Sequence, residues 1–307
     1  MSDEVIDKGL ELLARNAKED RDKDFHVMLF GGEPFLVPKK IKYIFDKGLE
    51  LEKEYKVKFT ASAVTNATIL TDELINLIKT YKHKVNFNIQ LSVDGIQVVQ
   101  DMYRITKDGR GSFNLVEKNV PKFIELYRDM PRMLAIHGCV NKYSLPYLFE
   151  SFKYFFEDYR FRSIWFMPVH EENWDENDVE IYREQLLKIK DYIMEKIKET
   201  GDQSLKDVVS PLNHCFSGQN RFYVPCGAGR KFISITADGD IYPCHHLFFN
   251  DKSTKIGDVF NGIDYIRKTM YEMYDANDMT CDKDCDHYHC YRCIALNYEV
   301  KCRNTFI

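Results

Sequence analysis

Apolar runs alternate with amphipathic stretches along the first two thirds of the chain. Short continuous apolar runs are typical of buried strands, and apolar positions three and four residues apart are typical of helices. The sequence predicts five strands, centred near residues 28, 60, 89, 136 and 165. Predicted helices follow them at residues 38–54, from Thr71, at 112–128, from Ser144 and at 176–199. This alternation predicts parallel strands joined by right-handed helical crossovers.

Five such units suit either an open doubly wound sheet or part of a barrel. The chain begins with a predicted helix, residues 3–15, capped by Ser2 or Asp3. A barrel would therefore lack its first strand. In either fold, ligands bind at the carboxyl ends of the strands. Four polar or glycine-rich segments fall there: Gly31-Gly32-Glu33-Pro34, Thr65-Asn66, Ser92-Val93-Asp94-Gly95 and Pro168-Val169-His170.

The alternation stops after Gly201. The sequence Ala237-Asp238-Gly239-Asp240, flanked by short apolar stretches, indicates a hairpin around an Asp-Gly turn, and residues 262–276 have a helical pattern. We therefore expect two domains, residues 1–205 and residues 206–307.

Eight of the nine cysteines lie in the second of these domains. They are Cys215, Cys226, Cys244, Cys281, Cys285, Cys290, Cys293 and Cys302. Because the N-terminus has no secretory signal, a set this dense favours metal binding over disulfides. Eight thiolates suffice for two four-ligand sites, which could hold iron–sulfur cubanes or zinc ions. Cys139, which lies apart from the set, is expected to be a small buried hydrophobic residue.

Charge and hydropathy exclude two classes of partner. A net charge of −5 leaves no basic face for nucleic acid. No apolar run approaches the roughly 18 residues that a membrane span needs, so no membrane partner is expected. Without an export signal, the expected compartment is a reducing cytoplasm.

The strand-end segments resemble those of the radical S-adenosylmethionine (SAM) enzymes. Gly31-Gly32-Glu33-Pro34 resembles their SAM-binding turn, and Thr65-Asn66-Ala67-Thr68 resembles their Thr-Asn-Gly-Thr segment, with Ala67 in place of glycine. Leu91-Ser92-Val93-Asp94-Gly95 is similar to their third such strand end. The tail resembles the SPASM auxiliary-cluster domain, in the spacing of Cys226, Gly239 and Cys244. The resemblance implies a partial (β/α)6-type TIM-like barrel without its first strand, followed by a small cysteine-rich SPASM domain.

The resemblance also implies the cofactors and their ligands. SAM would contact Gly31, Gly32, Glu33, Pro34, Thr65, Asn66, Ser92 and Asp94. One auxiliary [4Fe–4S] cluster would be bound by Cys215, Cys226, Cys244 and Cys293, and a second by Cys281, Cys285, Cys290 and Cys302. The spacing Cys281-x3-Cys285-x4-Cys290-x2-Cys293 departs from the family's Cys-x2-Cys-x5-Cys-x3-Cys. Zinc is the alternative, with four histidines available as mixed ligands: His245, His246, His287 and His289.

The three cysteines that hold the catalytic cluster in this family, Cys-x3-Cys-x2-Cys, have no counterpart. Residues 1–138 contain no cysteine. We therefore expect that this chain does not cleave SAM reductively and binds it weakly. Either the sequence starts late, with the first strand and cluster loop upstream, or the protein is a natural relative that lost the catalytic cluster.

The resemblance implies a peptide-modifying maturase of ribosomally made precursors, in full-length form. Its partners would be a peptide or protein substrate and an electron donor such as flavodoxin or ferredoxin. One alternative is a non-catalytic subunit that binds clusters or zinc. The other is a relative of the sulfatase-maturating enzymes, which we discount because His245 stands where they carry the aspartate base.

Two further sets of residues have open interpretations. Four residues after the fifth strand either line a substrate cavity or form a polar loop: His170, Glu171, Glu172 and Trp174. Arg104 either binds a carboxylate or pairs with a nearby acid such as Asp101.

Overall fold

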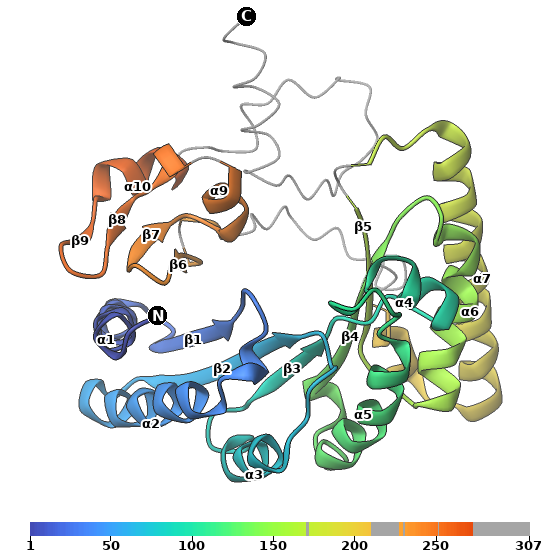
Figure 1. Cartoon of the computed structure of the whole chain (residues 1–307), viewed down its shortest axis with the longest axis horizontal. Helices are drawn as coiled ribbons and strands as arrows, with labels where there is room; N and C mark the ends of the chain where they lie inside the picture. Colours follow the sequence, from blue (N-terminus) through green and yellow to red (C-terminus); the bar gives the residue numbers. More distant parts are fainter. Residues whose placement is uncertain (170–171, 210–226, 230, 251, 273–307) are drawn as a thin grey trace, which may run out of the picture. The chain divides into compact units, whose positions relative to one another are not determined.

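The computed structural model describes residues 1–169, 172–209, 227–229, 231–250 and 252–272 (Figure 1). The chain divides into two compact units. The sheet unit comprises residues 25–49 and 58–218, and the cysteine-rich unit comprises residues 1–24, 50–57 and 219–307. The predicted domain boundary at residue 206 adjoins residues 210–226, which lie outside the described residues, and it stays a prediction.

The sheet unit is built on five strands in the order β1-β2-β3-β4-β5. Their bounds are β1 Asp24–Leu29, β2 Lys58–Thr65, β3 Asn88–Leu91, β4 Leu134–Val140 and β5 Ile164–Pro168. The pairings from β2 to β5 are parallel. All five predicted strands are confirmed. A doubly wound sheet would reverse its strand order at a switch point. The uninterrupted order therefore selects the partial barrel from the two predicted architectures.

The predicted helices are also confirmed, and those after β1 to β5 lie along one face of the sheet (Figure 1). They are α2 Pro38–Tyr55, α3 Asp72–Tyr81, α5 Phe113–Leu126, α6 Leu148–Lys153 and α7 Glu176–Thr200. Short 3-10 or π turns occupy Pro34–Leu36, Pro131–Met133, Leu145–Tyr147, Tyr154–Asp158 and Gln203–Asp207. The helix α4, Gln97–Tyr103, was not predicted, because its seven residues give too short a periodic pattern.

Alternation along the strands gives the sheet two different faces. The face beneath the helices is apolar, with Phe59 and Phe166 almost fully buried. Gly48 of α2 lies so close to this face that an added Cβ would be 2.3 Å from Cε1 of Phe59. The other face carries polar groups: the ring of His26 on β1 lies 2.8 Å from Thr60 Oγ1 and 2.7 Å from Ser62 Oγ on β2. The sheet therefore presents hydrogen-bonding side chains on the face opposite its helices.

The cysteine-rich unit combines the N-terminal helix α1, Asp3–Glu19, with a four-stranded antiparallel sheet. Ser2 caps α1 by accepting a hydrogen bond from Val5 N, as predicted. The strands and helices of the tail are β6 Ser234–Ile235, β7 Asp240–Tyr242, α9 His245–Asn250, β8 Gly257–Asp258, β9 Gly262–Ile263 and α10 Tyr265–Glu272. The predicted Asp-Gly hairpin is confirmed, and the helix predicted at residues 262–276 is confirmed over Tyr265–Glu272; residues 262–263 form β9 instead, and residues 273–276 lie outside the described residues. The two-residue strands β8 and β9 and the helix α9 were not predicted.

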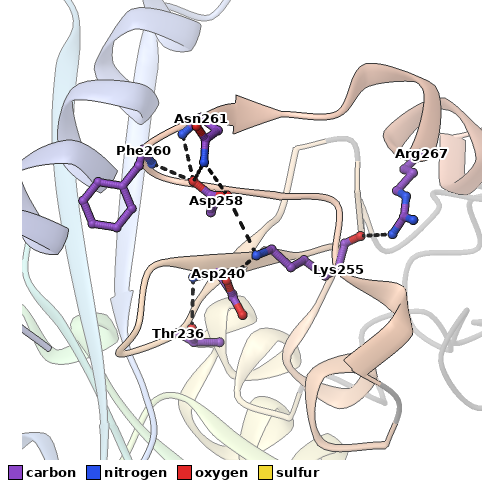
Figure 2. A network of polar contacts seen from close by, with 7 residues as sticks. All are labelled: Thr236, Asp240, Lys255, Asp258, Phe260, Asn261 and Arg267. Atoms are coloured by element: carbon purple, nitrogen blue, oxygen red, sulfur yellow. Dashed lines mark hydrogen bonds and ion pairs between the residues drawn. The ribbon is translucent and has the colours of Figure 1, made fainter.

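A polar network joins the strands of this small sheet (Figure 2). Lys255 Nζ lies 2.5 Å from Asp240 Oδ1 of β7 and 3.8 Å from Asp258 Oδ2 of β8. Arg267 of α10 donates to the backbone carbonyl of Lys255 at 3.1 Å. Asp258 also accepts from the backbone N–H and the side chain of Asn261. These contacts tie the strand that leads to Cys244 to the helix that precedes the C-terminal cysteines.

Candidate functional site

Glu33 connects the carboxyl ends of β1 and β2. Its Oε1 accepts hydrogen bonds from Thr65 Oγ1 at 2.7 Å and Phe35 N at 3.1 Å, and its Oε2 accepts from Asn66 N at 2.8 Å. Hydrogen bonds to a carboxylate are stronger than those between neutral groups. The two segments that the sequence analysis assigned to one ligand are therefore joined through this side chain.

The glycines before Glu33 leave open space above the turn. Gly31 and Gly32 have φ angles of +91° and +57°, which favour glycine. Among the described residues, adjacent chain neighbours aside, no atom lies within 4 Å of a Cβ built on either. Pro34, which is buried, begins the following 3-10 turn. An uncrowded backbone of this kind lets a ligand approach the peptide groups closely.

The Thr65-Asn66-Ala67-Thr68 segment folds back on itself. Asn66 Oδ1 accepts from Thr68 N at 3.0 Å and from Thr68 Oγ1 at 2.7 Å. Ala67 has a φ of +60° and is fully buried, and its carbonyl accepts from Asn119 at 3.0 Å. A left-handed conformation here explains why glycine would suit the position. Packing and the hydrogen bond from Asn119 hold the alanine in it.

Ser92 and Asp94 lie where β3 ends. The N–H of Ser92 donates to the carbonyl of Thr65 at 2.7 Å, which extends the β2–β3 pairing into the site. Asp94 Oδ2 accepts from Arg104 Nε at 2.6 Å, and its Oδ1 accepts from Arg104 Nη2 at 2.9 Å. The Asp94 carboxylate also accepts from the backbone N–H of Cys139 at 2.8 Å. Asp94 thereby joins the ends of β3 and β4.

Arg104 thus pairs with an acid, as one interpretation proposed, but that acid is Asp94 and not Asp101. Asp101 instead accepts from the backbone N–H of Phe113 at 2.8 Å. Burial acts to lower the pKa of Arg104, whereas the hydrogen bonds and charge of Asp94 raise it, and the net shift is upward. The bidentate pair is therefore charged and largely shielded from solvent.

The expectation that Cys139 is buried was wrong. Successive residues of a strand face opposite sides, and in β4 the buried Gly138 faces the helices while Cys139 is exposed on the other face. His137 shares this face. Burial and then the charge of Arg104 lower the pKa of His137, and Asp94 partly offsets them. Neither residue was predicted to neighbour the site, although alternation from Ile136 could have placed both of them on this face.

The residues after β5 contact the loop that follows β4 as well as their own loop. Glu172 Oε2 accepts from Lys142 N at 2.9 Å, and Trp174 Nε1 donates to the carbonyl of Val169 at 2.7 Å. His170 and Glu171 lie outside the described residues. The contacts of Glu172 and Trp174 agree with the polar-loop interpretation, and their role toward a substrate stays a prediction.

Cys244 is the one predicted metal ligand among the described residues. The other seven, Cys215, Cys226, Cys281, Cys285, Cys290, Cys293 and Cys302, lie outside them. Cys244 is 7% exposed and follows β7 after one intervening residue, Pro243. The N–H of Gly229 donates to the carbonyl of Pro243 at 3.1 Å, so the segment after Cys226 runs beside the residue before Cys244. Cys226 itself lies outside the described residues, so its place beside Cys244 in one cluster stays a prediction.

Within the described ranges, no three His, Cys, Asp or Glu side chains are grouped closely enough to hold a metal ion. The rings of His245 and His246 lie 4.5 Å apart. Burial, and then the neighbouring His246, lower the pKa of His245. The choice between iron–sulfur clusters and zinc ions therefore depends on all the predicted ligands together, which are eight cysteines and four histidines.

The comparisons with known proteins agree with the geometry. Residues 226–294 match the SPASM family, described as an iron–sulfur cluster-binding domain. A cysteine-type anaerobic sulfatase-maturating enzyme of Clostridium novyi (strain NT) is 24% identical over 314 residues, which cover 96% of this chain and 74% of that enzyme. None of the helices among the described residues has the length and apolar character to cross a bilayer.

Solved structures of anSMEcpe are similar in fold. The hexahistidine-tagged form with bound AdoMet aligns with a TM-score of 0.62 at 20% identity, over 84% of this chain and 66% of that chain. The native form with bound AdoMet and Cp18Cys peptide also gives 0.62, over 87% of this chain and 72% of that one. The chain therefore spans about two thirds of the length of these enzymes.

The sheet unit has the radical SAM fold, and a SPASM iron–sulfur domain follows it. Residues 226–294 thus match the SPASM domain, and the chain as a whole is similar in sequence and fold to sulfatase-maturating enzymes.

Proposed function

We propose that this protein is an iron–sulfur protein of the peptide-maturase type, which binds SAM at the sheet and two [4Fe–4S] clusters through the cysteines of residues 206–307. The observation that carries the proposal is the joining of the strand ends: Glu33 ties β1 to β2, and Asp94 ties β3 to β4. The SPASM match supports cluster binding, and the similarity to peptide-binding anSMEcpe supports a peptide substrate.

The chain's own residues would bind and orient the cofactor. The open backbone at Gly31 and Gly32 suits the polar amino-acid part of SAM, and Ser92 and Asn66 supply hydrogen-bonding side chains beside it. A catalytic [4Fe–4S] cluster, when bound, supplies the electron that cleaves SAM. Its usual three thiolates do not fit here, because residues 1–138 contain no cysteine and Cys139 is single.

The first test separates cluster binding from zinc binding. The chain is purified anaerobically, reconstituted with iron and sulfide, and its metal is counted. We expect charge-transfer absorption in the visible range and about eight irons per chain. A colourless protein with two zinc ions would overturn the proposal.

The second test concerns chemistry. The reconstituted chain is mixed with dithionite and SAM, and 5′-deoxyadenosine is measured together with SAM binding by calorimetry. We expect weak binding and no 5′-deoxyadenosine. Product from this chain alone would refute the account of the absent cluster ligands.

A sulfatase-maturating activity is the second candidate, because the curated relative that covers 96% of this chain is such an enzyme. Against it stands His245, which follows Cys244 where the resemblance requires an aspartate. The two candidates differ in substrate. If the protein matures sulfatases, a cysteine-containing sulfatase peptide should bind to it. If the protein is a maturase of another precursor, that sulfatase peptide should not compete with the precursor for binding.

A further inference from the structure

We propose that helix α1 positions Cys244, although 225 positions separate Cys244 from the end of the helix at Glu19. The proposal rests on the proposed function, in which Cys244 is a cluster ligand. It extends that function by assigning a role to the N-terminal helix, which lies outside the matched SPASM segment 226–294.

The first observation is a shared hydrophobic core. Val5 of α1 is 5% exposed and lies in one buried cluster with three residues of the tail: Ile241, Ile256 and Val259. Leu12, further along the same helix, packs against this cluster from the periphery. Ile241 belongs to β7 and is fully buried, so α1 supplies part of the packing that fixes this strand.

The second observation is the close approach at Gly9. Glycine lowers helix propensity, so its presence in the middle of the 17-residue α1 needs a reason. A Cβ built on Gly9 would lie 3.2 Å from Ile235 Cδ1 and 3.8 Å from Val259 Cγ1. A Cβ built on Gly239, in the hairpin turn, would lie 3.5 Å from Val5 Cγ2. A Cβ at Gly9 would therefore be tight against Ile235, whereas the distance between a Cβ at Gly239 and Val5 is an ordinary van der Waals contact.

The third observation is an ion pair beyond the helix. Asp22 Oδ2 lies 2.7 Å from Lys231 Nζ, and Lys231 follows the turn whose Gly229 bonds to the carbonyl of Pro243. Both charged side chains are exposed, so this pair adds little stability. It does place the chain after α1 beside the segment that adjoins Cys244.

The connection from this core to Cys244 is short. Ile235 pairs in register with Ile241, and Tyr242 and Pro243 lead from there to Cys244. Tyr242 is 2% exposed, so the connection is held by packing. Because ligand distances in metal sites are held to within about 0.2 Å, a displacement of β7 by a larger side chain at position 9 would disturb the Cys244 thiolate.

The test compares two valines on adjacent positions of α1. Gly9→Val overpacks the contact with Ile235, whereas Lys8→Val introduces the same side chain on the exposed face. The first readout is amide hydrogen exchange at Ile241 in the full chain without iron. Overpacking of a core should increase exchange about tenfold or more. We expect this increase for Gly9→Val and wild-type exchange for Lys8→Val.

The second readout is the electron paramagnetic resonance spectrum of the reduced, reconstituted protein, together with iron per chain. We expect Gly9→Val to shift the cluster signal that Cys244→Ala abolishes, and Lys8→Val to leave it unchanged. Should Gly9→Val fail to fold, Gly9→Ala introduces the smaller contact at 3.2 Å, and a smaller shift of the same signal is expected.

The outcomes are distinguishable. Unchanged exchange at Ile241 in Gly9→Val would overturn the packing role of α1. Increased exchange with a wild-type spectrum would overturn the positioning of Cys244 while leaving the proposed function intact. A wild-type chain that binds no iron would refute both the proposed function and the positioning role, and the exchange data would still decide the packing.

Discussion

Removal of the Glu33 carboxylate should release the end of β2 from the turn after β1. The substitution Glu33→Ala deletes the acceptor of three hydrogen bonds, from Phe35 N, Thr65 Oγ1 and Asn66 N. A hydrogen bond to a charged group contributes about 1.5–3 kcal/mol, and the bonds of one carboxylate are not additive. Glu33 is half-buried, so we expect a loss of about 2–4 kcal/mol in the local free energy of opening.

Glu33→Gln gives a graded comparison. The amide keeps one acceptor oxygen, but its NH2 group replaces the other carboxylate oxygen. That NH2 group must then face a donor whose hydrogen bond the carboxylate accepts in the wild type. We expect a cost of about 1–2 kcal/mol, between wild type and the alanine variant. The matched control is Glu54→Ala on the exposed surface of α2, which should stay within about 0.5 kcal/mol.

The assay is amide hydrogen exchange at Asn66, because its N–H donates directly to Glu33. A loss of about 2 kcal/mol corresponds to roughly 30-fold faster exchange when opening is local. SAM binding should weaken in parallel, since the turn and the Thr65-Asn66 segment would no longer be held together. Exchange at Asn66 as slow in Glu33→Ala as in Glu54→Ala would refute this role of the carboxylate.

Three further predictions concern packing and charge. Gly48→Ala should destabilise the sheet unit by about 1–3 kcal/mol in urea unfolding, in spite of better helix propensity, because the added methyl group would meet the ring of Phe59; a more stable variant would contradict the packing. Asp94→Asn should cost about 3–5 kcal/mol by leaving Arg104 partly buried without its partner, whereas Asp101→Asn should cost less; equal losses would contradict the pairing. The hydrogen bonds from Asn261 lower the pKa of Asp258, so its stabilising contribution is present above the unfolded value near pH 4 and is lost as the pH falls through the lower folded pKa. The protection of the Asn261 amide, measured as its exchange relative to that of an unprotected amide at the same pH, should accordingly fall below about pH 4 in the wild type. In Asp258→Asn this protection should depend less on pH.

Periodicity was sufficient for the architecture, and it failed where elements are short. The five strands and the long helices each contain several residues that repeat the pattern, whereas β8 and β9 contain two residues each. The seven-residue α4 had a further consequence. It brings Arg104 back to Asp94, so the acid partner could not be identified from sequence distance alone.

The strand ends were predictable for a different reason. Parallel strands place their carboxyl ends at one edge, so the convergence of Glu33 with Thr65 and Asn66 follows from topology. The exposure of Cys139 was not predicted, because the general tendency of cysteine to be buried was applied in place of alternation along β4. Only the local pattern around a residue, and not its type, decides which face of a strand it occupies.

SAM binding and SAM cleavage require different residues. The chain contains the residues proposed for binding, but not the three clustered cysteines that cleavage needs. The groups proposed to orient SAM, from Gly31 to Asp94, are all in the chain, and hydrogen bonds between strand ends hold Glu33 and Asp94 in place. The thiolates are concentrated after residue 214, apart from Cys139, which is single. A cluster with one iron free to bind SAM needs three thiolates near the proposed SAM-binding residues, and the single Cys139 cannot replace three. A separate peptide that carries Cys-x3-Cys-x2-Cys would supply these thiolates in trans. We expect it to tighten SAM binding before any product forms, because binding depends on the strand ends that Glu33 and Asp94 already hold together.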